Sequence, residues 1–547
     1  MKGPQRAVEC DVLVIGGGGA GLTAAIEARQ RGASVLVACK GRAGRSGNTV
    51  VAASMFSAVV SGDGVEDSPE QHFQDTLVGG KGINEERLVR ILASGGGSRL
   101  LRLEEWGVEL LRSDGELVRK WVPGHTRPRG IPVDNSRLPV AVGGLTITLP
   151  LRATAERMGV RFLDDSPVIQ LLLRDGEVCG ALVVCLEEGE LLQIKARSVV
   201  MAAGGAGRLY ASTNNTRGIC GDGYGLMLEA GAGLRDMEFV QFYPCQIFRP
   251  VVSPMLNSLF FEGAVLRNRH GERFMPLYDP VNEDRATRDV QAQAIFREVQ
   301  RGNGVEGGVY VDCTAVPEAA LQQRYFALTR DLRRQGVDLN RDWVRVEPTV
   351  HFVMGGAAID ERCGTNVPGL FAAGEAAGGV HGANRLGGNA LTEAVVFGAL
   401  AGQMAAKHAT DRKALPDPIP SSLLLEPAGG NESVDSLRQE LRRAMWGGAS
   451  IVRSETTLRS TLATVRECAA AVGRCRAASL SDLARREETR LMCLTAEAIV
   501  LSALPRRESR GAHYREDFPT GEDRWLGSHQ VRMVDGGMRV QFTPKQP

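Results

Sequence analysis

The hydrophobic pattern of the chain opens with a short buried strand and a helix. Residues 10–15 (CDVLVI) form a continuous apolar run, which is typical of a strand covered on both faces. A glycine-rich turn follows, and then the segment LTAAIEARQR, which predicts a helix ending at Gly32. A second apolar run, ASVLVACK at 33–40, predicts the next strand. This order of elements indicates a βαβ unit.

Two later stretches repeat the passage from a buried strand into small residues. The first is 196–210 (ARSVVMAAGGAGRLY), and the second is 369–402, which begins GLFAAGEAAGG. Runs of glycine and alanine let a large flat ligand approach the main chain. The second stretch continues into an alanine-rich helix that we expect to start near Asn389, with free N–H groups at its N-terminus.

The last part of the chain has a helical pattern. From Ser433 to about Leu504, leucine, alanine and arginine recur at helical spacing, which predicts a helical bundle. The segments 416–420 (PDPIP) and 426–431 (EPAGGN) are rich in helix-breaking residues, and we interpret them as linkers.

Composition narrows the class of protein. A chain of 547 residues is long enough for about three or four domains. The 65 basic and 64 acidic residues leave a net charge of +1, so no strong field would attract nucleic acid or anionic lipid. No apolar run approaches the ~20 residues of a membrane span, and no signal segment precedes the first strand. The eleven cysteines include no CxxC pair, so we expect no disulfide scaffold, zinc site or iron–sulfur cluster within this chain, and a cytoplasmic location.

The first glycine-rich turn predicts a dinucleotide site. Gly16, Gly18 and Gly21 have the GxGxxG spacing. The first glycine permits the tight turn, the second lets a pyrophosphate reach the backbone, and the third lets helix and strand pack closely. The helix N-terminus then faces the phosphates with its unpaired N–H groups.

Several anchoring points favour FAD over NAD. The acidic residue that usually binds ribose at the end of the second strand is replaced by Cys39 and Lys40. Three strand-and-glycine elements, with Glu375 in the last, suit a long ligand that is held from several directions. We therefore expect an FAD site.

Seven stretches carry a resemblance to a known family. They are GGAGRLY, GDGYGLMLEAGAGLRDMEFVQF, GERFMP, ATRDV, PTVHFVMGG, HGANRLGGNALTEAVVFG and RRESRGAHYREDFP. The whole chain resembles the flavoprotein subunits of fumarate reductase and succinate dehydrogenase, a family that includes L-aspartate oxidase and adenylylsulfate reductase. The resemblance implies an α/β fold: a Rossmann-like FAD-binding domain with an inserted α+β capping domain and a C-terminal helical domain. The implied bounds are 1–233 and 347–415 for the FAD domain, 234–346 for the cap, 433–515 for the helical domain and 516–547 for a C-terminal tail.

The resemblance also implies how FAD is held. Covalent members carry a histidine in an RSHT-like segment, whereas residues 45–49 of this chain read RSGNT. We therefore expect non-covalent FAD, which tilts the direction toward reduction. The implied cofactor contacts are Gly16, Gly18, Gly19, Ala20, Gly21, Cys39, Lys40, Ser46, Gly47, Thr49, Ala203, Gly204, Gly205, Asp222, Glu375, Arg385, Asn389, Ala390 and Leu391.

Three residues match the catalytic groups of the family. Arg288 matches the arginine that acts as general acid, and His351 and Arg385 match the groups that clamp the substrate carboxylate. An arginine is a weak acid, so this role requires an enclosed site with a proton supply. The simpler alternatives are a surface ion pair of Arg288 with Asp284 or Asp289, and a core position for His351.

Other positions depart from the family pattern. Tyr243 stands where the family has a substrate-binding histidine, and Asn257 and Phe260 replace the glutamate and arginine that pass protons to the catalytic arginine. We expect Tyr243 and Phe260 to border the substrate, and His125 to lie in a loop near it. The departures suggest an altered substrate, an unsaturated acid with one carboxylate and a bulkier or more apolar remainder.

Three hypotheses follow for function. The first is an FAD-dependent oxidoreductase of the fumarate reductase type that acts on a C=C bond beside the carboxylate of a small organic acid. Its electrons are exchanged with a separate iron–sulfur subunit, through which the resemblance permits peripheral membrane attachment. The second is an L-aspartate oxidase-like enzyme. The third is a non-catalytic flavoprotein subunit that relays electrons within a larger complex.

Overall fold

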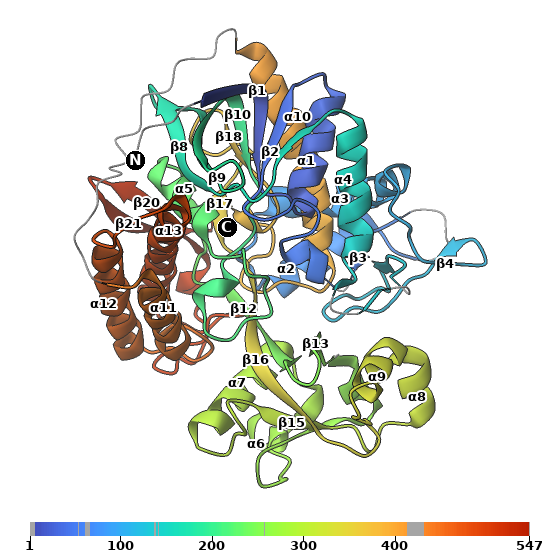
Figure 1. The fold of residues 1–547 in the computed structure, drawn as a ribbon. Helices are drawn as coiled ribbons and strands as arrows, with labels where there is room; N and C mark the ends of the chain where they lie inside the picture. Colours follow the sequence, from blue (N-terminus) through green and yellow to red (C-terminus); the bar gives the residue numbers. More distant parts are fainter. Residues whose placement is uncertain are drawn as a thin grey trace.

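The molecule consists of a large α/β body, a smaller lobe and a helical bundle (Figure 1). The computed structural model describes residues 6–52, 54–60, 66–135, 138–139, 142–255, 257–412 and 432–545. The segments interpreted as linkers, 416–420 and 426–431, lie outside the described residues.

The largest sheet is built from the apolar runs of the sequence. Its strands are β1 (Arg6–Ile15), β2 (Val35–Ala38), β7 (Arg161–Leu163), β8 (Val168–Arg174), β9 (Glu177–Cys185), β10 (Glu190–Met201) and β18 (Leu370–Ala372). Their order is β7-β2-β1-β10-β9-β8, and β18 pairs with β10. β1, β2, β7, β10 and β18 run parallel, whereas β9 and β8 are antiparallel. The parallel strands are buried on both faces, which explains their continuous apolar sequences.

Helices α1 (Gly19–Gln30), α5 (Asp222–Glu229) and α10 (Asn389–Asp411) pack against this sheet. Three more helices pack outside them: α4 (Leu145–Arg157) on α1, α3 (Glu86–Glu105) on α10, and α2 (Pro69–Gly79) on α3. α10 starts at the residue expected from the sequence and packs along α1. A Cβ on Gly398 would lie 2.6 Å from the carbonyl oxygen of Ala20, and one on Gly402 would lie 2.2 Å from that of Ala24. The two helices can approach this closely only because these positions are glycine.

The smaller lobe is the capping unit, and it has its own hydrophobic core. Its sheet has the order β13-β12-β16-β15-β14. The strands are β12 (Val240–Ile247), β13 (Ser253–Pro254), β14 (Val265–Arg267), β15 (Val309–Asp312) and β16 (Val344–Val353), and the helices are α6 (Met275–Tyr278), α7 (Arg288–Gln300), α8 (Glu318–Arg324) and α9 (Phe326–Arg333). The buried apolar residues of this core come from 245–346. β12 and β16 run between the α/β body and the lobe (Figure 1).

The C-terminal part contains the predicted helices and one element that we did not predict. The helices are α11 (Val434–Gly448), α12 (Glu455–Val472) and α13 (Leu480–Ala503). The stretch expected only as a tail holds a hairpin, β20 (Gly527–Val534) and β21 (Gly537–Pro544). The hairpin joins a second sheet with β11 (Leu234–Arg235), β17 (Gly356–Ala358) and β19 (Ala377–Gly378). The tail interpretation therefore missed a packed part of the body.

The remaining short elements complete the fold. Small two-stranded pairings are formed by β3 (Met55–Ser57) with β6 (Gly130–Pro132) and by β4 (Arg112–Ser113) with β5 (Glu116–Leu117).

No helix among the described residues is long and apolar enough to cross a bilayer. All eleven cysteines are buried and unpaired as free thiols.

Candidate active site

The three glycine-rich turns predicted from the sequence meet at one edge of the main sheet. In the parallel register Ile15 lies beside Met201, and Met201 lies beside Ala372. The N–H of Ala202 donates to the carbonyl of Ile15 at 2.8 Å, and that of Ala373 donates to Met201 at 3.0 Å. Because the carboxyl ends of parallel strands share an edge, turns far apart in sequence form one site.

The first turn has the geometry of a phosphate cradle. Gly16 has φ of +111°, and a Cβ there would lie 2.2 Å from the carbonyl oxygen of Ala202. A Cβ on Gly21 would lie 1.9 Å from the oxygen of Gly16. No side chain caps α1 at Gly18, which leaves the helix N-terminus free for an anion. The hydroxyl of Thr49 accepts a hydrogen bond from the N–H of Gly19 at 3.1 Å and so places the 45–49 segment against this turn.

Four residues expected to contact the cofactor, Cys39, Lys40, Ser46 and Asp222, have side chains that bind other side chains of the protein. The ammonium of Lys40 lies 2.9 Å from Asp222 and 2.6 Å from Glu488 on α13. The thiol of Cys39 contacts the hydroxyl of Ser46 at 3.6 Å. Lys40 therefore joins the end of β2 to the helical bundle, a role that the sequence did not indicate.

Glu375 lies at the second and third turns. Its carboxylate accepts hydrogen bonds from the N–H of Val353 at 3.0 Å and from the amide of Asn48 at 3.3 Å. A Cβ on Gly205 would lie 2.1 Å from this carboxylate, so only glycine fits at position 205. Burial raises the pKa of Glu375 to about 7, against the opposing effect of its hydrogen bonds.

The start of α10 offers backbone rather than side-chain groups. Asn389 is fully buried, and its amide is engaged by His72 at 2.9 Å and by Thr76 at 3.1 Å. The first-turn N–H groups of α10, including those of Ala390 and Leu391, remain donors for a ligand at this edge. Together the glycine cradle, Glu375 and two helix N-termini fit a long dinucleotide.

A second cluster lies beside this cradle, where the cap meets the body. Tyr243 on β12 and His351 on the adjacent β16 have ring centroids 5.7 Å apart. The guanidinium carbon of Arg288, the first residue of α7, lies 5.2 Å from the Tyr243 ring. The guanidinium of Arg385 lies 4.7 Å from the ring of Phe352, the neighbour of His351. The structure thus brings together Arg288, His351 and Arg385, which are distant in sequence.

The electrostatics of this cluster favour an anionic ligand. Burial and the charge of Arg288 lower the pKa of Arg385 to about 10. Burial, with the charges of both arginines, holds the pKa of His351 well below its usual range, so this imidazole is neutral. Neither arginine forms an ion pair with an acidic side chain of the described residues, and the Nε of each has no partner there. A buried Arg385 and a half-buried Arg288, neither of them held in an ion pair, favour the binding of a carboxylate.

The structure argues against the surface ion pair considered for Arg288. Asp284 instead pairs with Arg273 at 2.8 Å and accepts from the N–H of Leu266 at 2.7 Å. Arg288 is free to face the cluster instead.

Two neighbouring side chains that the sequence analysis did not single out support the cluster. The amide of Gln241 accepts from Arg385 at 2.9 Å and donates to the carbonyl of the same residue at 3.0 Å. The amide of Asn214 lies 3.2 Å from Nδ1 of His351. The alternation of β12 is the available signal for Gln241, because it shares a strand face with Tyr243. The run STNNT at 212–216 gives no comparable signal for Asn214.

The expected substrate-facing residues have different surroundings. The hydroxyl of Tyr243 donates to the carbonyl of Met255 at 2.8 Å, so its ring rather than its hydroxyl faces the cluster. Phe260 is only 2% exposed and belongs to the core of the cap. The amide of Asn257 donates to Gln291 at 2.7 Å. His125 contacts the backbone of Gly387 rather than Arg288, His351 or Arg385.

The fold and the site define an FAD-dependent oxidoreductase. Residues 11–391 match the model of an FAD binding domain, and residues 438–546 match that of the fumarate reductase flavoprotein C-terminus. The chain belongs to the family of fumarate reductase and succinate dehydrogenase flavoprotein subunits, enzymes that act on CH–CH groups. The resemblance inferred from the sequence and the fold class that it implied are confirmed.

Individual relatives align over nearly the whole chain. The chain is 38% identical over 533 residues to a fumarate reductase (CoM/CoB) subunit of Methanothermobacter marburgensis, covering 95% of this chain and 96% of that protein. It is 33% identical over 580 residues to the fumarate reductase flavoprotein subunit of Escherichia coli, covering 98% and 94%. A solved quinol fumarate reductase of Escherichia coli superposes with a TM-score of 0.87 at 31% identity, covering 99% of this chain and 97% of that one.

Proposed function

We propose that this protein reduces a carbon–carbon double bond beside a carboxylate. Arg385 binds the carboxylate, and Arg288 also faces the substrate and donates the proton to one carbon. His351 contributes a neutral imidazole to the same wall. FAD, when bound, supplies hydride chemistry.

The observation that carries this proposal is that two neighbouring guanidinium groups, of the buried Arg385 and the half-buried Arg288, have no ion-pair partner among the described residues. Arg288 and Arg385 lie around Tyr243 and His351, and neither has a carboxylate partner among the described residues. The charge of a substrate carboxylate would compensate them, and the charge that develops in the transition state would lie between them. Burial also brings the pKa of Arg385 down to about 10.

We further propose that the substrate is larger and less polar than fumarate. Where the family pattern has a substrate-binding histidine, this chain presents the ring of Tyr243. The hydroxyl of Tyr243 is hydrogen-bonded to the carbonyl of Met255. Asn257 is a neutral amide bound to Gln291, so it adds no charge for a second carboxylate. An unsaturated acid with one carboxylate and an apolar remainder suits this pocket.

The proposal includes non-covalent FAD and a separate electron partner. Asn48, in the segment that lacks the histidine of covalent members, has its amide bound to Asn215 at 2.9 Å and to Glu375 at 3.3 Å. No group of three or more metal-ligating side chains occurs among the described residues. We propose that electrons are exchanged with an iron–sulfur subunit, through which the chain would be held in a complex at the membrane.

The test is anaerobic re-oxidation of the reduced flavin by a panel of acids. Fumarate, bulkier unsaturated dicarboxylates and unsaturated monocarboxylates are added to the reduced protein, and the flavin absorbance is followed. We expect the fastest re-oxidation with a bulkier or monocarboxylic acid. The variant Arg288→Met should lose at least about 100-fold in rate, whereas the exposed neighbour control Arg285→Met should not change. Fumarate as the fastest oxidant would refute the altered substrate.

A second candidate is electron relay without organic chemistry. It is favoured by the contact of Asn257 with Gln291, because neutral amides do not pass protons as the glutamate of the family pattern does. In that case no acid re-oxidises the flavin, and Arg288→Met leaves the turnover of the complete complex unchanged. Oxidation of L-aspartate by the same protein would instead identify an L-aspartate oxidase-like enzyme.

A further inference from the structure

A short turn connects Arg385 to the start of α10, and it is held by side chains from distant segments. The turn, 387–389, contains Gly388 with φ of +76°. The carbonyl of Gly387 accepts two hydrogen bonds at 2.9 Å, one from the hydroxyl of Ser57 and one from Nε2 of His125. The position of Arg385 therefore depends on what holds this carbonyl.

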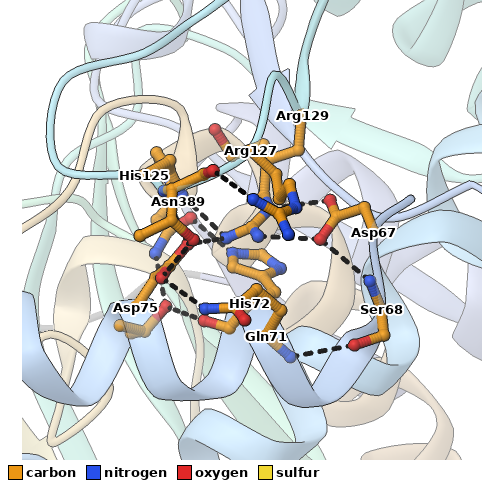
Figure 2. A network of polar contacts seen from close by, with 12 residues as sticks. Asp67, Ser68, Gln71, His72, Asp75, His125, Arg127, Arg129 and Asn389 are labelled. Carbon is orange, nitrogen blue, oxygen red and sulfur yellow. Dashed lines mark hydrogen bonds and ion pairs between the residues drawn. The ribbon is translucent and has the colours of Figure 1, made fainter. Parts of the chain in front are cut away.

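His125 is itself held by a buried ionic cluster, shown in Figure 2. Arg129 is fully buried and forms ion pairs with Asp67 at 2.8 Å and with Asp75 at 2.6 Å. Asp75 also accepts from the N–H and hydroxyl of Thr126, next to His125. The single guanidinium of Arg129 thus holds both carboxylates, and these hydrogen-bonded groups form a rigid base.

The cluster determines which nitrogen of His125 carries the proton. Arg129 lies 3.1 Å from Nδ1 of His125, and a guanidinium can only donate. Nδ1 must therefore accept, and Nε2 carries the hydrogen that is donated to Gly387. Burial, with the charge of Arg129, lowers the pKa of His125 to about 4, which keeps this arrangement at neutral pH.

A second histidine holds the other end of the turn. The amide nitrogen of Asn389 donates to the hydroxyl of Thr76, which in turn donates to the carbonyl of His72. The amide oxygen of Asn389 is left to accept from Nε2 of His72 at 2.9 Å. The ring centroids of His72 and His125 are 5.6 Å apart, and both histidines lie close to Asn389 (Figure 2).

We propose that His125 and His72 are positioning residues that fix the 387–389 turn, and through it both the reach of Arg385 and the first N–H groups of α10. Neither histidine contacts the substrate in this proposal, and His125, expected from the sequence to lie in a loop near the substrate, acts through the carbonyl of Gly387. The part that concerns Arg385 rests on the proposed function, because it assumes that this arginine binds the carboxylate. The part that concerns α10 rests on FAD binding alone.

The test compares two kinds of replacement at each histidine. His125→Leu and His72→Leu remove the hydrogen bond, whereas His125→Gln and His72→Gln keep an N–H donor near the position of Nε2. His270 is exposed on the cap, so His270→Leu is the matched control. The measurements are KM and kcat for the acid that best re-oxidises the flavin, and the dissociation constant of FAD with its visible spectrum.

We expect His125→Leu to raise KM about tenfold with a smaller change in kcat, since outer supports of binding groups typically have effects of this size. His72→Leu should weaken FAD binding about tenfold and shift the flavin spectrum, and each glutamine variant should restore most of the loss. Unchanged KM, FAD affinity and spectrum in both leucine variants would overturn the proposal. Glutamine variants that fold but behave like the leucine variants would also overturn it.

The two proposals fail in different ways. If the wild-type protein reacts with no acid, the proposed function fails, and the FAD measurements alone decide the positioning role. If the wild-type protein reacts and the histidine variants match it in every measurement, only the positioning role fails.

Discussion

Replacement of Arg506 tests how the C-terminal segment supports the site. Arg506 and Glu238 are both fully buried, and Nε of Arg506 lies 2.6 Å from the carboxylate of Glu238. The same guanidinium also binds Glu508 at 2.9 Å and the carbonyls of Trp525 and Gly527, each at 2.9 Å. Glu238 lies just before β12, the strand that carries Tyr243 and Gln241.

The variant Arg506→Met leaves the buried Glu238 with His529 at 2.9 Å as its remaining side-chain partner, whereas Glu508 keeps its ion pair with Arg510 at 2.8 Å. Although burial opposes ionisation, the charge of Arg506 and the hydrogen bond with His529 hold the pKa of Glu238 below its usual range. Removing one partner of a buried pair typically costs about 3–5 kcal/mol, since the remaining charge is uncompensated. The double variant Arg506→Met with Glu238→Gln should recover part of this loss.

The assay is urea unfolding of the FAD-loaded protein, followed by flavin fluorescence on release. Arg539→Met is the control, because the Arg539–Asp535 pair is 70% and 83% exposed; such a surface pair contributes at most about 1 kcal/mol. The reasoning about an uncompensated charge is wrong if the free energy of unfolding of Arg506→Met lies within about 1 kcal/mol of that of the control. It is also wrong if adding Glu238→Gln to Arg506→Met recovers none of the lost free energy of unfolding.

Three further predictions follow from the site. Tyr243→Phe loses only the hydrogen bond to the carbonyl of Met255, so thermal unfolding should show a stability loss of about 1 kcal/mol. The rate of flavin re-oxidation should stay within about threefold of the wild-type rate. A larger drop in that rate would show that the hydroxyl acts on the substrate. Burial raises the pKa of Glu375 to about 7, so ionisation of this carboxyl group opposes folding. The free energy of unfolding of the FAD-free protein should therefore fall by at most about 3 kcal/mol between about pH 5 and 8. The variant Glu375→Gln should abolish this pH dependence. Acid precipitation should release all FAD into the supernatant, and flavin fluorescence retained on the denatured band would contradict non-covalent binding.

The cofactor cradle was predictable because glycine requirements are local. Gly16, Gly18 and Gly21 are read directly from their spacing, and the positive φ of Gly16 and the contact at Gly21 give the physical reasons. The meeting of the three turns follows from parallel strands, which the apolar runs already indicated.

The partners of individual polar side chains were not predictable in the same way. Lys40 pairs with Glu488, which lies 448 positions away in the chain, and no local pattern encodes such a contact. Arg506 within RRESRGAH and Glu238 within RDMEF were noted only as matching motifs, and their ion pair gives the reason for both. The Asp535–Gly536 pair was a usable hairpin signal that we did not apply, since it separates two segments of alternating pattern.

The glycine contact between α1 and α10 also fixes how far the start of one helix lies from the start of the other. Gly398 faces Ala20 and Gly402 faces Ala24, so the helices are parallel and α10 extends about eight residues, or about 12 Å, beyond the start of α1. Each helix begins with a partial positive charge at its N-terminus, and these two charges are therefore held at a fixed separation along a common direction. Two helix N-termini that are offset in this way suit an extended ligand with anionic or polar groups at separate positions. A side chain introduced at Gly402, far along α10, would thus change the distance between the N-termini of α1 and α10 without touching the ligand.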